Sequence, residues 1–197
     1  MHRIFLLSIS LLFTQIGMAQ NLPQQAEDIA PLLIGEVFPD SGASNLEGAA
    51  IQVQSLLADK PAVVVFYRGG WCPYCNRHLA ELAQIESQIL DLGYQIIAVS
   101  PDAPVELNKT LDKNGINYTL LSDGSGTLAK AAGIAFQAPE RYGERLAKYS
   151  VGANEGYLPV PAVFVINPER EILFEFISPN YKQRLSGAML LAVLQNL

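Results

Sequence analysis

Short apolar runs recur through the middle of the chain and are separated by amphipathic stretches. Three of these runs, at 62–67 (AVVVFY), 94–100 (YQIIAVS) and 118–123 (YTLLSD), are rich in β-branched and aromatic residues. Continuous runs of this kind are typical of strands that are covered on both faces in a parallel sheet. Parallel strands need crossover connections, so we expect helices between them.

The stretch that follows 62–67 has the periodicity of such a helix. Its apolar residues recur every three or four positions, while polar side chains occupy the other side. The apolar set is Leu79, Leu82, Ile85, Ile89 and Leu92. Gly93 follows where a helix commonly ends. Further helices are predicted at about 102–113 and 125–132, and the turn at 122–126 (SDGSG) is expected to cap the second of them.

The C-terminal third departs from this rhythm. Residues 136–157 contain an amphipathic segment that we expect to form a solvated surface helix, with a lid or a dimer contact as the alternative. Two strand-like runs, 162–167 and 172–177, flank a short polar turn and predict an antiparallel hairpin. Residues 181–194 predict a closing amphipathic helix. Strands that alternate with helices in this way predict one layered α/β domain.

The first residues have the pattern of an export signal. His2 and Arg3 precede an apolar run at 4–16, and the small residues of GMA at 17–19 follow, so we predict a signal peptide over 1–19. The run is shorter than the ~20 residues that span a bilayer. We therefore expect neither a membrane anchor nor stable membrane insertion after the signal is removed.

Cleavage after residue 19 would leave a polar lead-in at 20–34 and a folded domain at 35–197. The mature protein is then exported, to the periplasm if the cell is Gram-negative and otherwise as a secreted protein. Loss of Arg3 takes the formal net charge from −6 to −7. An acidic domain without a basic cluster is a poor binder of nucleic acid, so we expect no nucleic-acid partner.

Candidate chemistry is concentrated where the first apolar run meets the first helix. The two cysteines of the chain, Cys72 and Cys75, lie three residues apart at this corner. A disulfide between them would close almost no loop, so it would stabilise the fold very little. Free N–H groups at a helix start favour the thiolate, and neighbouring cysteines can exchange a disulfide. We interpret the two as a redox pair at the carboxyl edge of the sheet, where open α/β folds place their sites.

A zinc site is the main structural alternative for this pair. A closed zinc site needs four ligands, and after the predicted signal peptide only His78 adds an imidazole. We therefore predict no metal and no cofactor. His78 is interpreted as a residue of the polar face or a support for the site rather than a base.

Neighbouring residues are expected to assist the pair. Arg68 adds a positive charge that favours the thiolate, and Trp71 can shield the sulfurs from solvent. Further along, Pro161 stands at the head of a predicted strand. A cis Val160–Pro161 bond there would leave backbone groups free to pair with a substrate, so we predict a cis bond and assign Trp71, Val160 and Pro161 to substrate binding.

Four stretches together carry a resemblance to a known family. In chain order they are GEVFPD, VVVFYRGGWCPYC, LLSDGSGTLAKAAGI and PAVFVINPEREI. Over nearly all of 35–197 the chain resembles the peroxiredoxin-like branch of the thioredoxin superfamily, the alkyl hydroperoxide reductase/thiol-specific antioxidant family. The resemblance implies a thioredoxin-like α/β fold with a central mixed β-sheet flanked by helices. It also implies reduction of hydroperoxides or disulfides by a cysteine that cycles through sulfenic acid or a disulfide.

By this resemblance Cys75 takes the place of the family's peroxidatic cysteine, at the end of FYxxxxxxxC. The chain departs from the family at three positions, because Arg68 stands for a proline, Cys72 for a threonine and Pro161 for an arginine. Two groups that normally orient and polarise the peroxide are therefore missing. Their replacements, Cys72 and Pro161, are residues that thioredoxin-type exchangers use.

Two mechanisms fit this one site. As a peroxidase, the chain would attack a hydroperoxide with the Cys75 thiolate, Cys72 would resolve the sulfenic acid to a disulfide, and a thioredoxin-like reductant protein would restore both thiols. As an oxidoreductase of protein disulfides, it would attack with Cys72, which we expect to be the more exposed cysteine. Similarity over the whole domain favours the peroxidase. A non-enzymatic redox sensor is disfavoured because no output surface is evident. Whether the chain forms a homodimer stays open.

Overall fold

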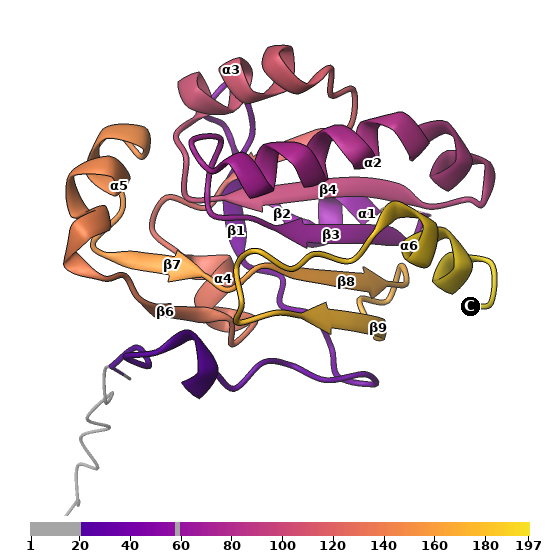
Figure 1. Cartoon of the computed structure of the whole chain (residues 1–197). Coiled ribbons are helices and arrows are strands. Elements are labelled where there is room, and N and C mark those ends of the chain that lie inside the picture. The colour runs from indigo at the N-terminus through magenta and orange to yellow at the C-terminus, as the bar shows by residue number, and fades with distance from the viewer. Residues whose placement is uncertain (1–20, 58–59) are drawn as a thin grey trace, which may run out of the picture.

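A mixed seven-stranded sheet lies at the centre of the molecule (Figure 1). The computed structural model describes residues 21–57 and 60–197, so the predicted signal peptide at 1–19 lies outside the described residues. The strands follow the order β2-β1-β5-β4-β3-β8-β9. Their bounds are β1 Gly42–Ser44, β2 Ala50–Gln52, β3 Ala62–Phe66, β4 Gln95–Ser100, β5 Thr119–Ser122, β8 Ala162–Ile166 and β9 Ile172–Ile177.

Three neighbouring strands of this sheet are parallel. β3 pairs with β4 and β4 pairs with β5 in the parallel sense. β8 runs antiparallel to β3 and β9 antiparallel to β8, while β1 is antiparallel to both β2 and β5. The carboxyl ends of β3, β4 and β5 therefore meet at one edge, and the loops that leave them lie side by side.

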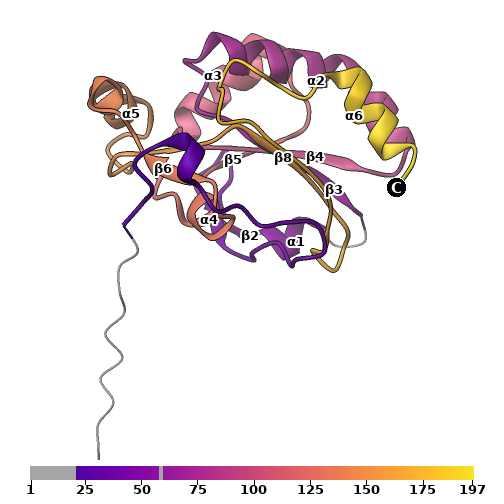
Figure 2. The same cartoon turned by 60° about the horizontal axis from the view of Figure 1, so that its bottom comes forward.

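Helices cover both faces of the sheet (Figure 2). α2, α3 and α6 pack on one face, and α1 and α4 pack on the other. Their bounds are α1 Val53–Leu57, α2 Pro73–Asp91, α3 Pro104–Asn114, α4 Thr127–Ala131 and α6 Gly187–Leu194. Along β3, Val63 and Val65 belong to one core layer and Val64 and Phe66 to the other. The run at 62–67 is unbroken because both faces of its strand are buried.

The architecture confirms the predicted α/β class and the mixed sheet flanked by helices. The three predicted buried strands correspond to β3, β4 and β5, and the predicted hairpin corresponds to β8 and β9. The lead-in carries one 3-10 turn, η1 (Ala26–Asp28). Among the helices described, none is both long and apolar enough to cross a membrane.

A small second sheet beside the main one was not predicted. β6 (Ala135–Gln137) and β7 (Tyr157–Pro159) pair antiparallel, and between them the chain forms η2 (Glu140–Tyr142) and α5 (Gly143–Tyr149). Both strands are only three residues long, so neither gives a recognisable periodic run. α5 is the expected surface helix: it buries Leu146 and leaves most of its other side chains exposed.

The predicted helix at 181–194 is wrong in its first part, because α6 begins only at Gly187. The Ser186 side chain accepts a hydrogen bond from the N–H of Met189 (3.3 Å), which fixes the helix start there. Glu81 of α2 accepts the N–H of Gly187 at 2.6 Å. The preceding residues run irregularly past the start of α2 instead of coiling.

Candidate active site

The chain turns sharply between β3 and α2, and two hydrogen bonds and one close packing contact hold the turn. Gly69 has φ +134°, a conformation that favours glycine. Gly70 has no room for a side chain, since a Cβ there would clash with Thr110 Oγ1. Asp102 Oδ2 accepts the N–H of Gly70 at 2.6 Å, and Asn76 Nδ2 donates to its carbonyl at 2.8 Å. The loop that leads into the helix is therefore fixed on both sides.

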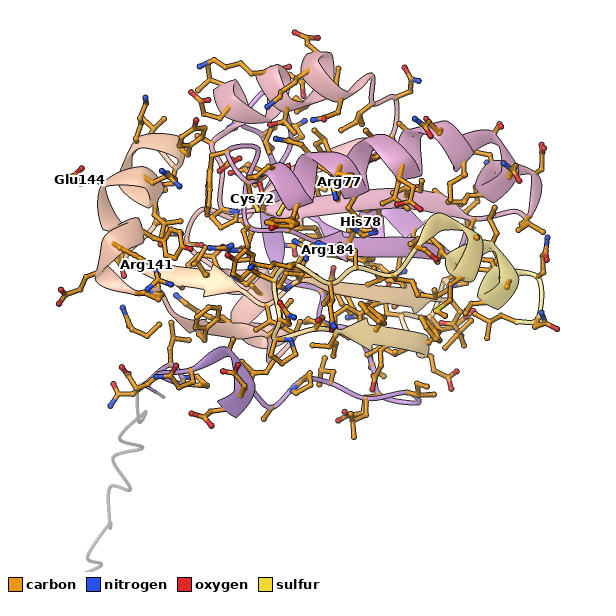
Figure 3. The ribbon with its side chains drawn as sticks, in the orientation of Figure 1. Cys72, Arg77, His78, Arg141, Glu144 and Arg184 are labelled. Carbon is orange, nitrogen blue, oxygen red and sulfur yellow. The ribbon has the colours of Figure 1, made fainter. Side chains whose placement is uncertain are left out.

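Both cysteines lie at the start of α2, as predicted. Cys72, labelled in Figure 3, is the residue that caps the helix, and Cys75 lies in the first turn. They are free thiols and almost fully buried, with exposed fractions of 1% and 0%. Cys72, expected to be the more exposed of the two, is almost as deeply buried as Cys75, because Trp71 and Tyr74 pack against the same apolar cluster. Trp71 lies where it can shield the pair.

The pKa values of the two thiols are shifted in opposite directions, although both thiols lie at one helix start. Hydrogen bonding from Cys75, aided by the charges of Arg68 and Arg184, lowers the pKa of Cys72 to about 6 against the effect of burial. Burial raises the pKa of Cys75, and its hydrogen bond and repulsion with Cys72 raise it further. At pH 7 the pair therefore carries one negative charge and one proton, with the charge on Cys72.

Arg184 contacts the second sulfur and was missed by the sequence analysis. Its Nη2 lies 3.3 Å from Cys75 Sγ, and its Nη1 donates to the carbonyls of Tyr181 and, at 2.7 Å, Gln183. Figure 3 shows Arg184 reaching this end of α2 from the segment before α6. The contact joins residues 109 positions apart, and nothing local in the sequence marks it.

Arg68 is buried among aromatic rings. Its exposed fraction is 4%, and its guanidinium carbon lies 5.0 Å from the ring centre of Trp71, 4.7 Å from Tyr142 and 4.4 Å from Tyr181. Within residues 21–57 and 60–197 the ion pair found joins Lys109 to Glu106, so Arg68 has no acidic partner there. The predicted influence of its charge on the thiolate agrees with the lowered pKa of Cys72.

The predicted cis bond before Pro161 is wrong, since the described chain contains no cis peptide bond. The neighbouring backbone is also already paired: Val160 donates its N–H to the carbonyl of Ile134 at 2.8 Å, and Pro161 accepts from the N–H of Ser178 at 3.0 Å. These contacts leave less backbone for a substrate strand than predicted. Both side chains nevertheless line a pocket of about 160 Å³ together with Arg68.

His78 and Asp102 are buried polar groups close to the pair. Burial, with the charge of Arg184, lowers the pKa of His78 to about 4, so the ring is neutral at pH 7. Its Nε2 has no hydrogen-bond partner among the described residues. Burial raises the pKa of Asp102 to about 7 even though the N–H of Gly70 lowers it. In the part of the chain that the structure describes, no three Cys, His, Asp or Glu side chains gather as metal ligands.

Comparison with known sequences gives a consistent family. Residues 34–174 match the pattern that defines the AhpC/TSA family. The chain is 28% identical over 104 residues to "Putative peroxiredoxin bcp" of Haemophilus influenzae, an alignment that covers 53% of this chain and 66% of that one. It is 26% identical over 112 residues to "Peroxiredoxin bcp1" of Schizosaccharomyces pombe, covering 56% and 57%. The chain thus spans less than two thirds of these relatives' length.

Comparison with solved structures supports the same fold. The peroxidoxin BcpB of Mycobacterium tuberculosis superposes with a TM-score of 0.66 at 20% identity, over 83% of this chain and 97% of that one. Reduced Prx3 of Vibrio vulnificus superposes with a TM-score of 0.70 at 18% identity, over 83% and 99%. The mixed sheet with helices on both faces is therefore the thioredoxin-like fold of these proteins.

Proposed function

The chain belongs to the AhpC/TSA family, and from that premise we propose that it is an exported thiol peroxidase that reduces hydroperoxides through Cys72 and Cys75. The relatives named peroxiredoxin support this activity. A thioredoxin-type protein thiol returns the oxidised pair to the dithiol. No cofactor is needed, because the two sulfurs carry both electrons.

One observation carries the proposal: Arg184 touches the sulfur of Cys75 at the start of α2. A guanidinium in this position can stabilise negative charge on the sulfur and can also bind the oxygen that leaves the peroxide. It supplies the charge that the family's arginine, replaced here by Pro161, would otherwise bring. In this scheme the arginine that binds the peroxide comes from the segment before α6, whereas in the family pattern it comes from a strand.

The resting pair is set up for attack by Cys75. Cys72 holds the negative charge and accepts the hydrogen bond of the Cys75 thiol, so it can act as the base that removes that proton. The Cys75 sulfur attacks the terminal oxygen of ROOH, the O–O bond breaks, and Cys75 becomes sulfenic acid. The proton taken up by Cys72 passes to the leaving RO⁻ and gives ROH.

The second half of the reaction closes a disulfide. The Cys72 thiolate attacks the sulfur of the sulfenic acid, and the displaced hydroxide takes a proton from solvent to form water. The net change is one hydroperoxide and two thiols converted to one alcohol, one water and one disulfide. An external dithiol then reduces the disulfide by exchange.

Rapid mixing with hydrogen peroxide tests this scheme, with the fluorescence of Trp71 as readout. Trp71 is the single tryptophan and adjoins Cys72, so oxidation of the pair changes its environment. We expect two phases in the native protein, one slower phase in Cys72→Ser that shifts to higher pH, and no response in Cys75→Ser. A normal first phase in Cys75→Ser would contradict attack by Cys75.

Exchange with protein disulfides is a second candidate, favoured by the low pKa of Cys72. A thiolate of pKa about 6 at a helix cap is a good nucleophile toward disulfides. The same fluorescence experiment with an oxidised protein substrate separates the two functions. A response to the disulfide alone, abolished by Cys72→Ser, would identify exchange as the activity.

Export forms the last part of the proposal and is supported by the pattern of residues 1–19 alone. Expression of the whole gene in a Gram-negative host should yield periplasmic protein whose N-terminal residue is Gln20. Mass spectrometry of the periplasmic fraction measures this directly. Full-length protein retained in the cytoplasm would contradict export without affecting the peroxidase.

A further inference from the structure

A small pocket opens at Arg68, in the turn between β3 and α2 that leads to the two cysteines. It has a volume of about 160 Å³, below the roughly 300–1,000 Å³ of typical sites for drug-sized ligands, so it suits a small organic molecule. Most of its walls are apolar. The apolar lining residues include Phe136, Leu158, Pro159, Val160, Pro161 and Pro179.

The charge in the wall of this pocket is unusual. Arg68 lines it, is 4% exposed, and faces three aromatic rings instead of an acid. Aromatic faces offset only part of the cost of burying a cation. Among the described residues no carboxylate pairs with it. A buried guanidinium without an acid favours an anion brought by a ligand.

A second guanidinium belongs to the same pocket. Arg141 of η2 lies in the lining, is exposed, and stacks on Tyr142 at 5.0 Å from its ring centre. Figure 3 shows it below α5, on the same side of the molecule as the start of α2. One acid, Glu27, also lines the pocket, but it is exposed and forms no ion pair with either arginine. Two cations and one solvated acid leave a net positive charge at this pocket.

We propose that this pocket binds the carboxylate of a small organic acid, carried either by the hydroperoxide or by the thiol that reduces the disulfide. The proposal rests on the peroxidase function and narrows the molecules that the site accepts. The guanidiniums of Arg68 and Arg141 hold the carboxylate, and the apolar walls hold the attached chain. Planar guanidiniums match carboxylates with two parallel hydrogen bonds.

The position of Arg68 connects the pocket to the reaction. Its side chain lines the pocket, and its charge also acts on the Cys72 thiol. The backbone just after it forms the loop whose Gly69 carbonyl accepts the N–H of Cys72 at 3.1 Å. A molecule held by this guanidinium therefore lies at the beginning of the loop that carries Cys72.

Binding of hexanoate tests the pocket without any turnover. Titration is followed by the fluorescence of Trp71, which lies against Arg68, and by calorimetry, and the uncharged hexanamide serves as reference. We expect hexanoate to bind about ten- to a hundredfold more tightly than hexanamide, as charged hydrogen bonds imply. Equal affinity for the two molecules would overturn the proposal.

Variants locate the bound molecule. Arg141→Gln should weaken hexanoate and leave hexanamide unchanged, Glu27→Gln should strengthen hexanoate, and Lys148→Gln, an exposed charge outside the pocket, is the matched control. Arg68→Met should remove the preference for hexanoate. If that variant fails to fold, Arg141→Gln still decides, and an effect no larger than that of the control would overturn the proposal.

Two kinetic comparisons identify the source of the carboxylate. The first compares 6-hydroperoxyhexanoate with hexyl hydroperoxide, and the second compares 3-mercaptopropionate with 2-mercaptoethanol as reductants of the oxidised protein. A faster charged partner in either comparison, reduced by Arg141→Gln, assigns the pocket to that molecule. No preference in either comparison overturns the proposal. If no hydroperoxide reacts at all, the peroxidase function is contradicted. The binding of hexanoate still tests whether the pocket holds a carboxylate.

Discussion

Among the helices that begin at the carboxyl edge of the sheet, α2 and α4 use their starts in opposite ways. At α4, which follows β5, Asp123 accepts the N–H groups of Leu128 at 3.0 Å and Ala129 at 2.8 Å. At α2, which follows β3, no side chain makes a capping hydrogen bond and Cys72 occupies the cap. One helix start thus faces a fixed carboxylate and the other faces an ionisable sulfur.

The groups at these two starts reach similar pKa values from opposite directions. Burial raises the pKa of Asp123 to about 6, although the N–H groups of α4 lower it. Hydrogen bonding from Cys75 lowers the pKa of Cys72 to about 6, although burial raises it. At pH 7 both starts face an anion. Both helix starts therefore accommodate a negative charge. The chemistry of the anion decides its role: the carboxylate of Asp123 makes the start of α4 a structural start, and the sulfur of Cys72 makes the start of α2 a reactive start.

The largest effect should follow from removing the guanidinium at the reactive start. Arg184→Met leaves Cys75 without its charged contact, and we expect the rate of reaction with hydrogen peroxide to fall about 10²–10³-fold, as for loss of a donor to a developing oxyanion. Because the charge of Arg184 also lowers the pKa of Cys72, that pKa should rise. Stopped-flow fluorescence measures the rate, and thiolate absorbance against pH measures the pKa.

Two further variants make this test specific. Arg77 is exposed on α2, so Arg77→Met removes the same charge without touching either sulfur. Arg184→Lys keeps the charge as a point cation and should recover part of the rate. If Arg184→Met behaves like Arg77→Met, Arg184 has no part in the reaction.

Removal of the carboxylate at the structural start, that of α4, should lower the stability of the protein and leave its rate with hydrogen peroxide nearly unchanged. Asp123→Ala removes two hydrogen bonds to a buried carboxylate, and we expect the free energy of unfolding at pH 7.5 to fall by about 3 kcal/mol. The rate with hydrogen peroxide should change less than about twofold, since no residue of the pair is touched. Urea denaturation and stopped-flow fluorescence on the same preparation measure both quantities. A large loss of rate in a folded variant would remove the distinction between the two starts.

Most of the fold could be predicted because it depends on local periodicity. The run at 62–67 and the spacing of apolar residues after it are enough to place β3 and α2. The cap at 122–126 could be predicted for the same reason, since Asp123 and the N–H groups it accepts lie within six positions. β6 and β7 were not predicted, because strands of three residues are too short to show a recognisable alternation of apolar and polar residues.

The candidate site could be predicted only where its residues share one stretch of chain. Arg68, Trp71 and Cys72 lie in the turn between β3 and α2, and Cys75 lies in the first turn of α2. Arg184 could not be predicted, because its contact depends on where α6 starts and how the preceding segment runs. The cis bond before Pro161 was predicted from one position, without the pairing of the neighbouring backbone that tertiary structure supplies.

The smallest expected effect concerns a second carboxyl at this edge, Asp102. It accepts the N–H of Gly70 and so holds the loop of the reactive start, but burial raises its pKa to about 7. A raised pKa means that the folded protein keeps a proton that the unfolded chain loses near its ordinary value. The contribution of Asp102 to stability is therefore complete at low pH and is lost as pH rises toward 7.

Asp102→Asn should remove this dependence while keeping an oxygen for the N–H of Gly70. Between pH 5 and pH 7 the free energy of unfolding of the native protein should fall by about 2 kcal/mol more than that of the variant. Urea denaturation across this range measures the difference, with Asp112→Asn, an exposed aspartate on α3, as control. Asp123, whose pKa is also raised, keeps a slope of the same sign in the variant. Identical slopes in native protein and Asp102→Asn would mean that the carboxylate of Asp102, which holds the loop before α2, is ionised throughout this range.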